Sequence, residues 1–163
     1  MLLTILLKDE DDLVGWQAAD ALRKLHNPNT VPALLERLDP EIEDDADTRT
    51  AAALALGQYA DRVVFSRLVT ALEQGSYNVV AASHYSLMLL TGVDQGLEPQ
   101  AWAEWLDQTA EPFARQRPYT YNTYTVQRSW WDEYVTFWNN ADGSSDGPQT
   151  PRGLDGAGAT EGG

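Results

Sequence analysis

The sequence contains no cysteine, which excludes disulfides, thiolate nucleophiles and cysteine-based metal sites. Basic residues are scarce as well: 11 lysines and arginines stand against 25 acidic residues, for a formal net charge of −14. A surface of this charge repels nucleic-acid phosphates and anionic membranes, and it attracts a basic surface. We therefore expect the partner to be another protein, one with a basic surface in the simplest case, and not a nucleic acid.

Long hydrophobic runs are also missing. The start, "MLLTILLKDEDD", has six apolar residues among its first seven, but it lacks the basic region and the cleavage site of a signal peptide. No stretch approaches the roughly 20 apolar residues of a membrane-spanning helix. We expect no membrane insertion. The compartment is not encoded, and a cytoplasmic location is only the default assumption.

Three segments repeat one pattern: "VGWQAADALRKL" (14–25), "TRTAAALALGQY" (48–59) and "VVAASHYSLMLL" (79–90). Aligned without gaps, they carry apolar or small residues at positions i, i+4, i+8 and i+11, which form one stripe of a helix. The second of these positions is always small, and a small residue lets a neighbouring helix approach closely. Its occupants are Ala18, Ala52 and Ser83.

A shorter leucine pattern precedes each segment, so every repeat has two helices. The leucine pairs are Leu3 and Leu7, Leu34 and Leu38, and Leu68 and Leu72. The first pairs are 31 residues apart (34 − 3), as are Thr48 and Val79 in the later segments (79 − 48). A three-residue insertion within "DPEIEDDAD" (39–47) explains the spacing of 34 elsewhere. Two-helix units of this length predict an all-α fold, an α-solenoid.

We expect about three helical hairpins, over residues 1–26, 27–60 and 61–92, and a capping helix over 98–108, within a solenoid that spans 1–111. Asp47 and Asn78 stand near the expected starts of the second helices. Gly92 stands where a left-handed C-cap residue is needed. Pro99 suits the first turn of the capping helix.

The pattern resembles HEAT repeats, in particular the short HEAT-like units of phycobilisome-lyase-type proteins. The second helix of that family typically reads V-R-x-x-A-A-x-A-L-G-x-L, and "TRTAAALALGQY" is similar to it. The third copy departs, with Ser83 and His84 in place of the Ala pair. The segment "LTGVDQGLEPQAWAEWL" (90–106) resembles a run that often closes such arrays. This resemblance covers residues 2–106 and implies protein–protein binding or scaffolding.

Each end of the solenoid needs a cover for its apolar face. The first helix has only about seven residues, which is short for such a unit. We expect upstream repeats, or another molecule, to cover this end. At the other end, residues 119–138 hold eight of the sixteen aromatic residues. We expect residues 112–138 to form an aromatic strap on the solenoid, although Tyr119 and Tyr121 are candidates to line a peptide groove instead. Residues 139–163 are expected to be a disordered tail.

Residues with a catalytic pattern are hard to find. His26 stands at a helix end, and Ser83 and His84 are adjacent, so their side chains diverge by about 100° on a helix. No phosphate-binding loop, G-x-G-x-x-G or H-E-x-x-H motif is present. We expect no enzyme, no cofactor and no metal site. The acidic segment 39–47 lacks the spacing of a calcium-binding loop.

Two sets of residues are candidates for partner contacts. The first lies on the second helices, facing away from the apolar stripe, and Trp16 is the strongest member because it lies outside the repeat's apolar columns. The set is Trp16, Gln17, Asp20, Arg49, Ala53, Gln58, Val80 and His84. The second set lies on two acidic loops expected at one edge of the solenoid, where a basic partner would dock. It is Asp9, Glu10, Asp11, Asp12, Glu41, Glu43, Asp44 and Asp45.

Two alternatives stay open. The resemblance also allows an accessory protein of the phycobilin lyase type, although nothing in this short, acidic chain indicates a tetrapyrrole cleft. A purely structural terminal module of a larger repeat protein is the other alternative, and it would use Trp16 to pack against an upstream repeat.

Overall fold

The computed structural model describes residues 7, 9, 12–74, 76–120 and 150–153. The helices in these ranges are α2 (Asp12–Arg23), the 3-10 helix η1 (Pro28–Thr30), α3 (Val31–Leu38), α4 (Ala46–Leu56), α5 (Arg62–Gln74), α6 (Tyr77–Thr91) and α7 (Pro99–Gln108). The described part contains no strand, only one isolated β-bridge between Leu25 and Arg152. The prediction of an all-α fold is confirmed.

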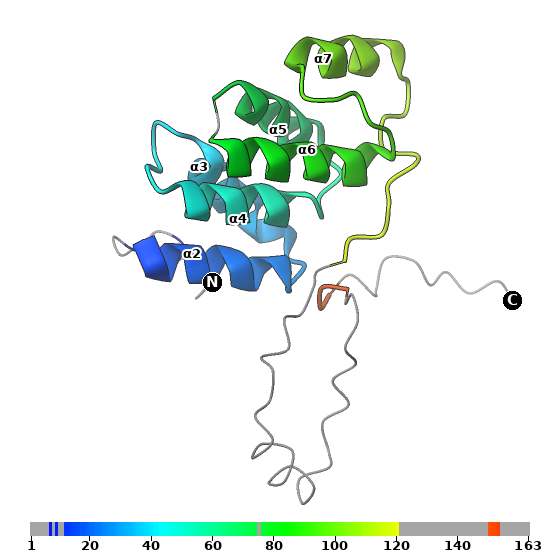
Figure 1. Ribbon diagram of the computed structural model, residues 1–163. Helices are drawn as coiled ribbons and strands as arrows, with labels where there is room; N and C mark the ends of the chain where they lie inside the picture. Colours follow the sequence, from blue (N-terminus) through cyan, green and yellow to red (C-terminus); the bar gives the residue numbers. More distant parts are fainter. Residues whose placement is uncertain (1–6, 8, 10–11, 75, 121–149, 154–163) are drawn as a thin grey trace, which may run out of the picture.

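The helices form two layers (Figure 1). The second helices of the repeats, α2, α4 and α6, lie side by side in that order, and each packs on the next. Helices α3 and α5 form the other layer: α3 packs on α4, α5 packs on α6, and the two contact each other. Helix α7 packs on α5 at the far end. This is the stacked-hairpin arrangement of an α-solenoid.

The core follows the aligned columns of the sequence. The leucine column of the second helices, Leu22, Leu56 and Leu87, is fully buried. The small column is buried too, because Ala18, Ala52 and Ser83 face the first-helix layer at close range. These columns fix which side of each second helix faces inward.

Helices α4 and α6 approach each other closely. The Ser86 hydroxyl of α6 donates a hydrogen bond to the Ala53 carbonyl oxygen of α4, at 2.8 Å. A Cβ atom on Gly57, directly after α4, would lie only 2.8 Å from the same hydroxyl oxygen. Small residues are therefore required where one second helix lies on the next.

The caps of the second helices are partly where the sequence places them. Gly92 has φ 73° and ends α6, as expected for a left-handed C-cap. The expectation for Asp47 is wrong, because Asp45 is the N-cap of α4 and its carboxylate accepts the Thr48 N–H at 2.7 Å. Asn78 likewise lies inside α6, whose N-cap is Ser76.

The far end of the stack is closed by aromatic side chains. Trp102 of α7 is fully buried, and its indole N–H donates to the Gly96 carbonyl oxygen at 2.8 Å. The rings of Trp102 and Phe113 both contact Phe65 of α5, with centroids 6.1 and 6.5 Å away. The expected capping helix is thus present, and the segment that follows it returns to the core.

The first part of the expected strap lies along α6. The Arg117 N–H donates to the Leu89 carbonyl oxygen at 2.7 Å, and Tyr119 is buried against Leu89. Burial raises the pKa of the Tyr119 phenol to about 12. Tyr119 therefore packs within the protein and does not line an open groove, whereas Tyr121 and the rest of the strap, up to residue 138, lie outside the described residues.

The contact between the strap and the end of α6 is testable at two glycines. Gly92 and Gly96 both have positive φ, but a Cβ on Gly92 would meet the Arg115 carbonyl oxygen, whereas one on Gly96 would meet nothing within 4 Å. We expect Gly96→Ala to lower the free energy of unfolding by about 1 kcal/mol, the cost of the left-handed conformation. Gly92→Ala should cost about 1–3 kcal/mol more, because it also displaces the strap.

Urea unfolding of both variants and the parent chain, followed by circular dichroism, measures the two losses. Gly96→Ala is the matched control for backbone strain. Equal losses in the two variants would contradict the described contact between Gly92 and Arg115.

Candidate functional site

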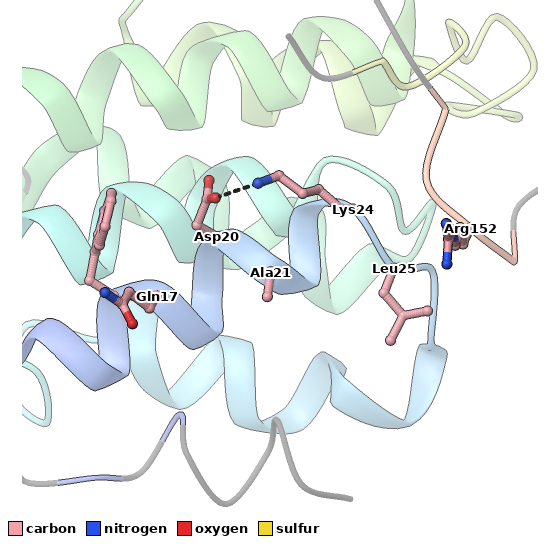
Figure 2. Close-up of a pocket in the computed structure, with 7 residues that line it drawn as sticks. Gln17, Asp20, Ala21, Lys24, Leu25 and Arg152 are labelled. Carbon is pink, nitrogen blue, oxygen red and sulfur yellow. Dashed lines mark hydrogen bonds and ion pairs between the residues drawn. The ribbon is translucent and has the colours of Figure 1, made fainter. Parts of the chain in front are cut away.

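Helix α2 exposes apolar side chains on the side that faces away from the stack. It buries Ala18, Ala19 and Leu22 toward its neighbours, whereas Trp16 is 40% exposed and Leu13 59% exposed. A pocket of about 590 Å³ lies on this outer side (Figure 2). Its lining residues are Trp16, Gln17, Asp20, Ala21, Lys24, Leu25 and Arg152. We call them the α2 face.

The charged groups of the α2 face are paired within one helical turn. The Asp20 carboxylate accepts a hydrogen bond from the Arg23 guanidinium at 2.8 Å and one from the Lys24 ammonium at 2.9 Å. Figure 2 shows Lys24 reaching back along the helix to Asp20. Such i,i+3 and i,i+4 pairs hold the side chains at the rim of the face, and Asp20 is the acid that both cations share.

A segment remote in sequence closes the C-terminal end of the α2 face. The His26 N–H donates to the Arg152 carbonyl oxygen at 2.7 Å, and the Arg152 N–H donates to the Lys24 carbonyl oxygen at 2.9 Å. Residues 150–153 belong to the stretch expected to be disordered, and for these four residues that expectation is wrong. Nothing in their sequence marks this pairing, so Arg152 was missed.

The first three predicted contact residues come together on the α2 face: Trp16, Gln17 and Asp20 all line its pocket. The others lie elsewhere. Arg49 and Val80 are half-buried on α4 and α6. Sequence reasoning missed Ala21 and Lys24, although both follow Gln17 at helical spacing on the same side.

Two predicted contact residues are wrong. Gln58 is 2% exposed, and its side-chain amide donates to the Leu22 carbonyl oxygen of α2 at 3.0 Å. Ala53 is fully buried where α4 meets α6. The reason is that α4 is the middle helix of the stack, so neighbouring helices cover both of its flanks.

His84 belongs to the cap. Its Nε2 lies 2.8 Å from the Asp94 carboxylate, and its ring meets Trp102 edge-on, with centroids 6.3 Å apart. The Gly96 N–H, and then His84, hold the pKa of Asp94 below its usual range. The buried Ser83 hydroxyl makes no hydrogen bond within the described part of the chain, so Ser83 and His84 do not form a nucleophile–base pair.

The acidic loop before α4 is partly structural. Glu43 is buried: it accepts the Arg37 guanidinium at 2.7 Å and the Asp45 N–H at 3.0 Å. Partial burial acts against ionisation of Asp45, but hydrogen bonds from Thr48 outweigh it and lower the Asp45 pKa. Glu43 and Asp45 are therefore wrong as docking residues.

Glu41 and Asp44 of the same loop are exposed. Asp9 of the other acidic loop is exposed as well. Glu10 and Asp11 lie outside the described residues, and Asp12 is described only as the first residue of α2. The expected pairing of the two acidic loops stays a prediction. Within the described residues, no helix is long and apolar enough to cross a membrane.

A family model for HEAT repeats matches residues 1–88, more than half of the chain. The protein therefore belongs to the HEAT-repeat family, whose repeats commonly mediate protein–protein interaction or scaffolding. A search of curated proteins found no match.

The bond between His84 and Asp94 generates a pH prediction. Because the Asp94 pKa lies below its usual 3.8 in the folded protein, its carboxylate stabilises the fold above about pH 3.8, and this contribution is lost as the pH falls through the lowered pKa. Asp94→Asn should therefore lower the Tm at pH 5, and the difference from the parent chain should shrink as the pH falls below 3.8.

Thermal melts of both proteins from pH 2 to pH 5 measure this difference. Asp107→Asn, at an exposed position of α7, is the control for removing one negative charge. A Tm difference for Asp94→Asn that is the same at pH 2 as at pH 5 would contradict the stabilising role of the carboxylate.

Proposed function

We propose that this protein is a non-enzymatic protein-binding module that takes its partner on the α2 face. The observation that carries the proposal is the exposure of Trp16, 40% accessible at the edge of a pocket on a helix whose other side is buried in the stack. A tryptophan side chain has a large apolar area, and exposing it to water is costly. Tryptophan is also among the residues that contribute most to protein interfaces.

The surroundings of Trp16 support a protein partner. The pocket is wide and shallow, and both apolar and charged side chains line it, as at the centre and rim of a protein interface. Its charges, Asp20, Lys24 and Arg152, are of both signs. A partner therefore needs an apolar centre and a polar rim to fit it.

The strong negative charge favours a partner with a basic rim. A net charge of −14 speeds the approach of a positively charged surface and slows that of a negative one. Glu41 and Asp44 are exposed and are the acidic loop residues that we propose to take part. Their contribution would depend on salt, because exposed charges are screened.

The proposal is tested with the full chain as bait and chemical cross-linking in a cell extract. Trp16→Ser should reduce the recovered partner by about 30-fold, the effect of losing roughly 2 kcal/mol at an interface hot spot. Tyr77→Ser is the matched control, because Tyr77 is an aromatic residue that is 86% exposed on α6, away from the pocket.

The parent chain and Tyr77→Ser should recover the same partner through cross-links to α2. A Trp16→Ser variant that folds normally and recovers the partner as well as the parent chain would refute the α2 face as the binding site.

A further inference from the structure

The second helices of the stack use the same positions to cover the preceding helix. In α4 these positions are Ala51, Ala55 and Gln58, which are 4%, 0% and 2% exposed. The aligned positions of the first two in α6 are Ala82 and Ser86, which are also buried. A small residue thus stands at the centre of both interfaces between repeats.

Polar groups at these positions bond to the backbone of the preceding helix. The Gln58 amide donates to the carbonyl oxygen of Leu22, at 3.0 Å, and to that of Arg23, at 3.4 Å. Ser86 donates to the Ala53 carbonyl oxygen in the same way. The last carbonyl groups of a helix have no partner within the helix, so Gln58 supplies a donor that the end of α2 requires.

Helix α2 carries Gln17, Ala21 and Lys24 at the same three positions, because its register differs from that of α4 by 34 residues (51 − 17, 55 − 21 and 58 − 24). All three line the pocket. Ala21 keeps the small central residue. Lys24, in the place of Gln58, keeps a side-chain donor, and its positive charge suits the negative end of a helix dipole. The α2 face thus continues the two interfaces inside the stack.

We propose that the α2 face binds the second helix of a HEAT-like hairpin carried by another protein. This inference rests on the proposed function and names its partner class. The bound helix runs parallel to α2, crosses it closely at Ala21, and places its last carbonyl groups beside Lys24. Trp16 covers one edge of the contact.

A second copy of this chain does not offer the required helix. In α6 the position that corresponds to Ala53, on the side facing away from the preceding helix, is His84. His84 is covered by Trp102 of α7 and bonded to Asp94, so the far end of the stack is already closed. The net charge of −14 on each copy also opposes self-association.

The test supplies such a hairpin in the same polypeptide, because one hairpin does not fold well without neighbours and a short connection gives a high effective concentration. A copy of residues 27–65 is joined directly to Met1 of the full chain. In the native chain Leu68 follows residue 65 by three positions, and in the fusion Leu3 does so, which keeps the repeat register. The added copy contains no lysine.

The readout is the rate at which an amine-reactive acylating reagent labels Lys24, measured by peptide mass. Lys24 is exposed in the parent chain, and its labelling should be at least about tenfold slower in the fusion, because the docked helix end takes up its ammonium group. Ala21→Arg in the fusion should restore fast labelling. Ala21→Ser, which copies the small residue of α6, should keep it slow.

Equal labelling of Lys24 in the fusion and the parent chain would overturn the inference, as would slow labelling that persists with Ala21→Arg. So would a dimer of the parent chain, found by light scattering, that Ala21→Arg dissociates, since the occupant would then be a second copy. If the fusion leaves Lys24 accessible but Trp16→Ser still abolishes partner recovery, only the hairpin inference fails. If Trp16→Ser has no effect either, the proposed function fails with it.

Discussion

The close approach of neighbouring second helices is the constraint on which the structure depends. Helix α4 lies between α2 and α6, and small residues such as Ala51 and Ala55 stand where it meets the preceding helix. Larger side chains at these positions would push the repeats apart and open the core behind them. The buried bonds from Gln58 and Ser86 to backbone carbonyl oxygens are possible only at this short range.

The two ends of the stack meet this constraint differently. At the far end, Trp102, Phe113 and the Tyr119 strap cover α5 and α6 with aromatic side chains. At the other end, the outer side of α2 exposes a tryptophan and repeats the small-residue pattern of an internal interface. A solenoid is held together by contacts between neighbouring repeats, so a side of this kind is suited to binding one more element. The family, the fold and the proposed binding site therefore rest on the same geometry.

Much of the fold could be predicted from the sequence, because helical periodicity and small residues report directly on which side of a helix is buried. Gly92 and the capping helix were equally readable from local backbone chemistry. Periodicity alone did not show that both flanks of α4 are covered, so Gln58 was taken for an exposed residue. The roles of Glu43 and Arg152 depend on partners that lie elsewhere in the fold, Arg37 and the end of α2, and no local pattern records such contacts.

Hydrogen exchange of the backbone amides, followed by mass spectrometry, tests the central claim most directly. If the repeats are held together by close contacts between neighbouring second helices, then α4, covered on both flanks, should exchange slowly together with α6, whose outer side is capped. Helix α2, with one flank open, should exchange faster, because local opening requires fewer buried contacts to break. Exchange in α2 as slow as in α4 would contradict the account, since α2 would then be as fully packed as the middle of the stack.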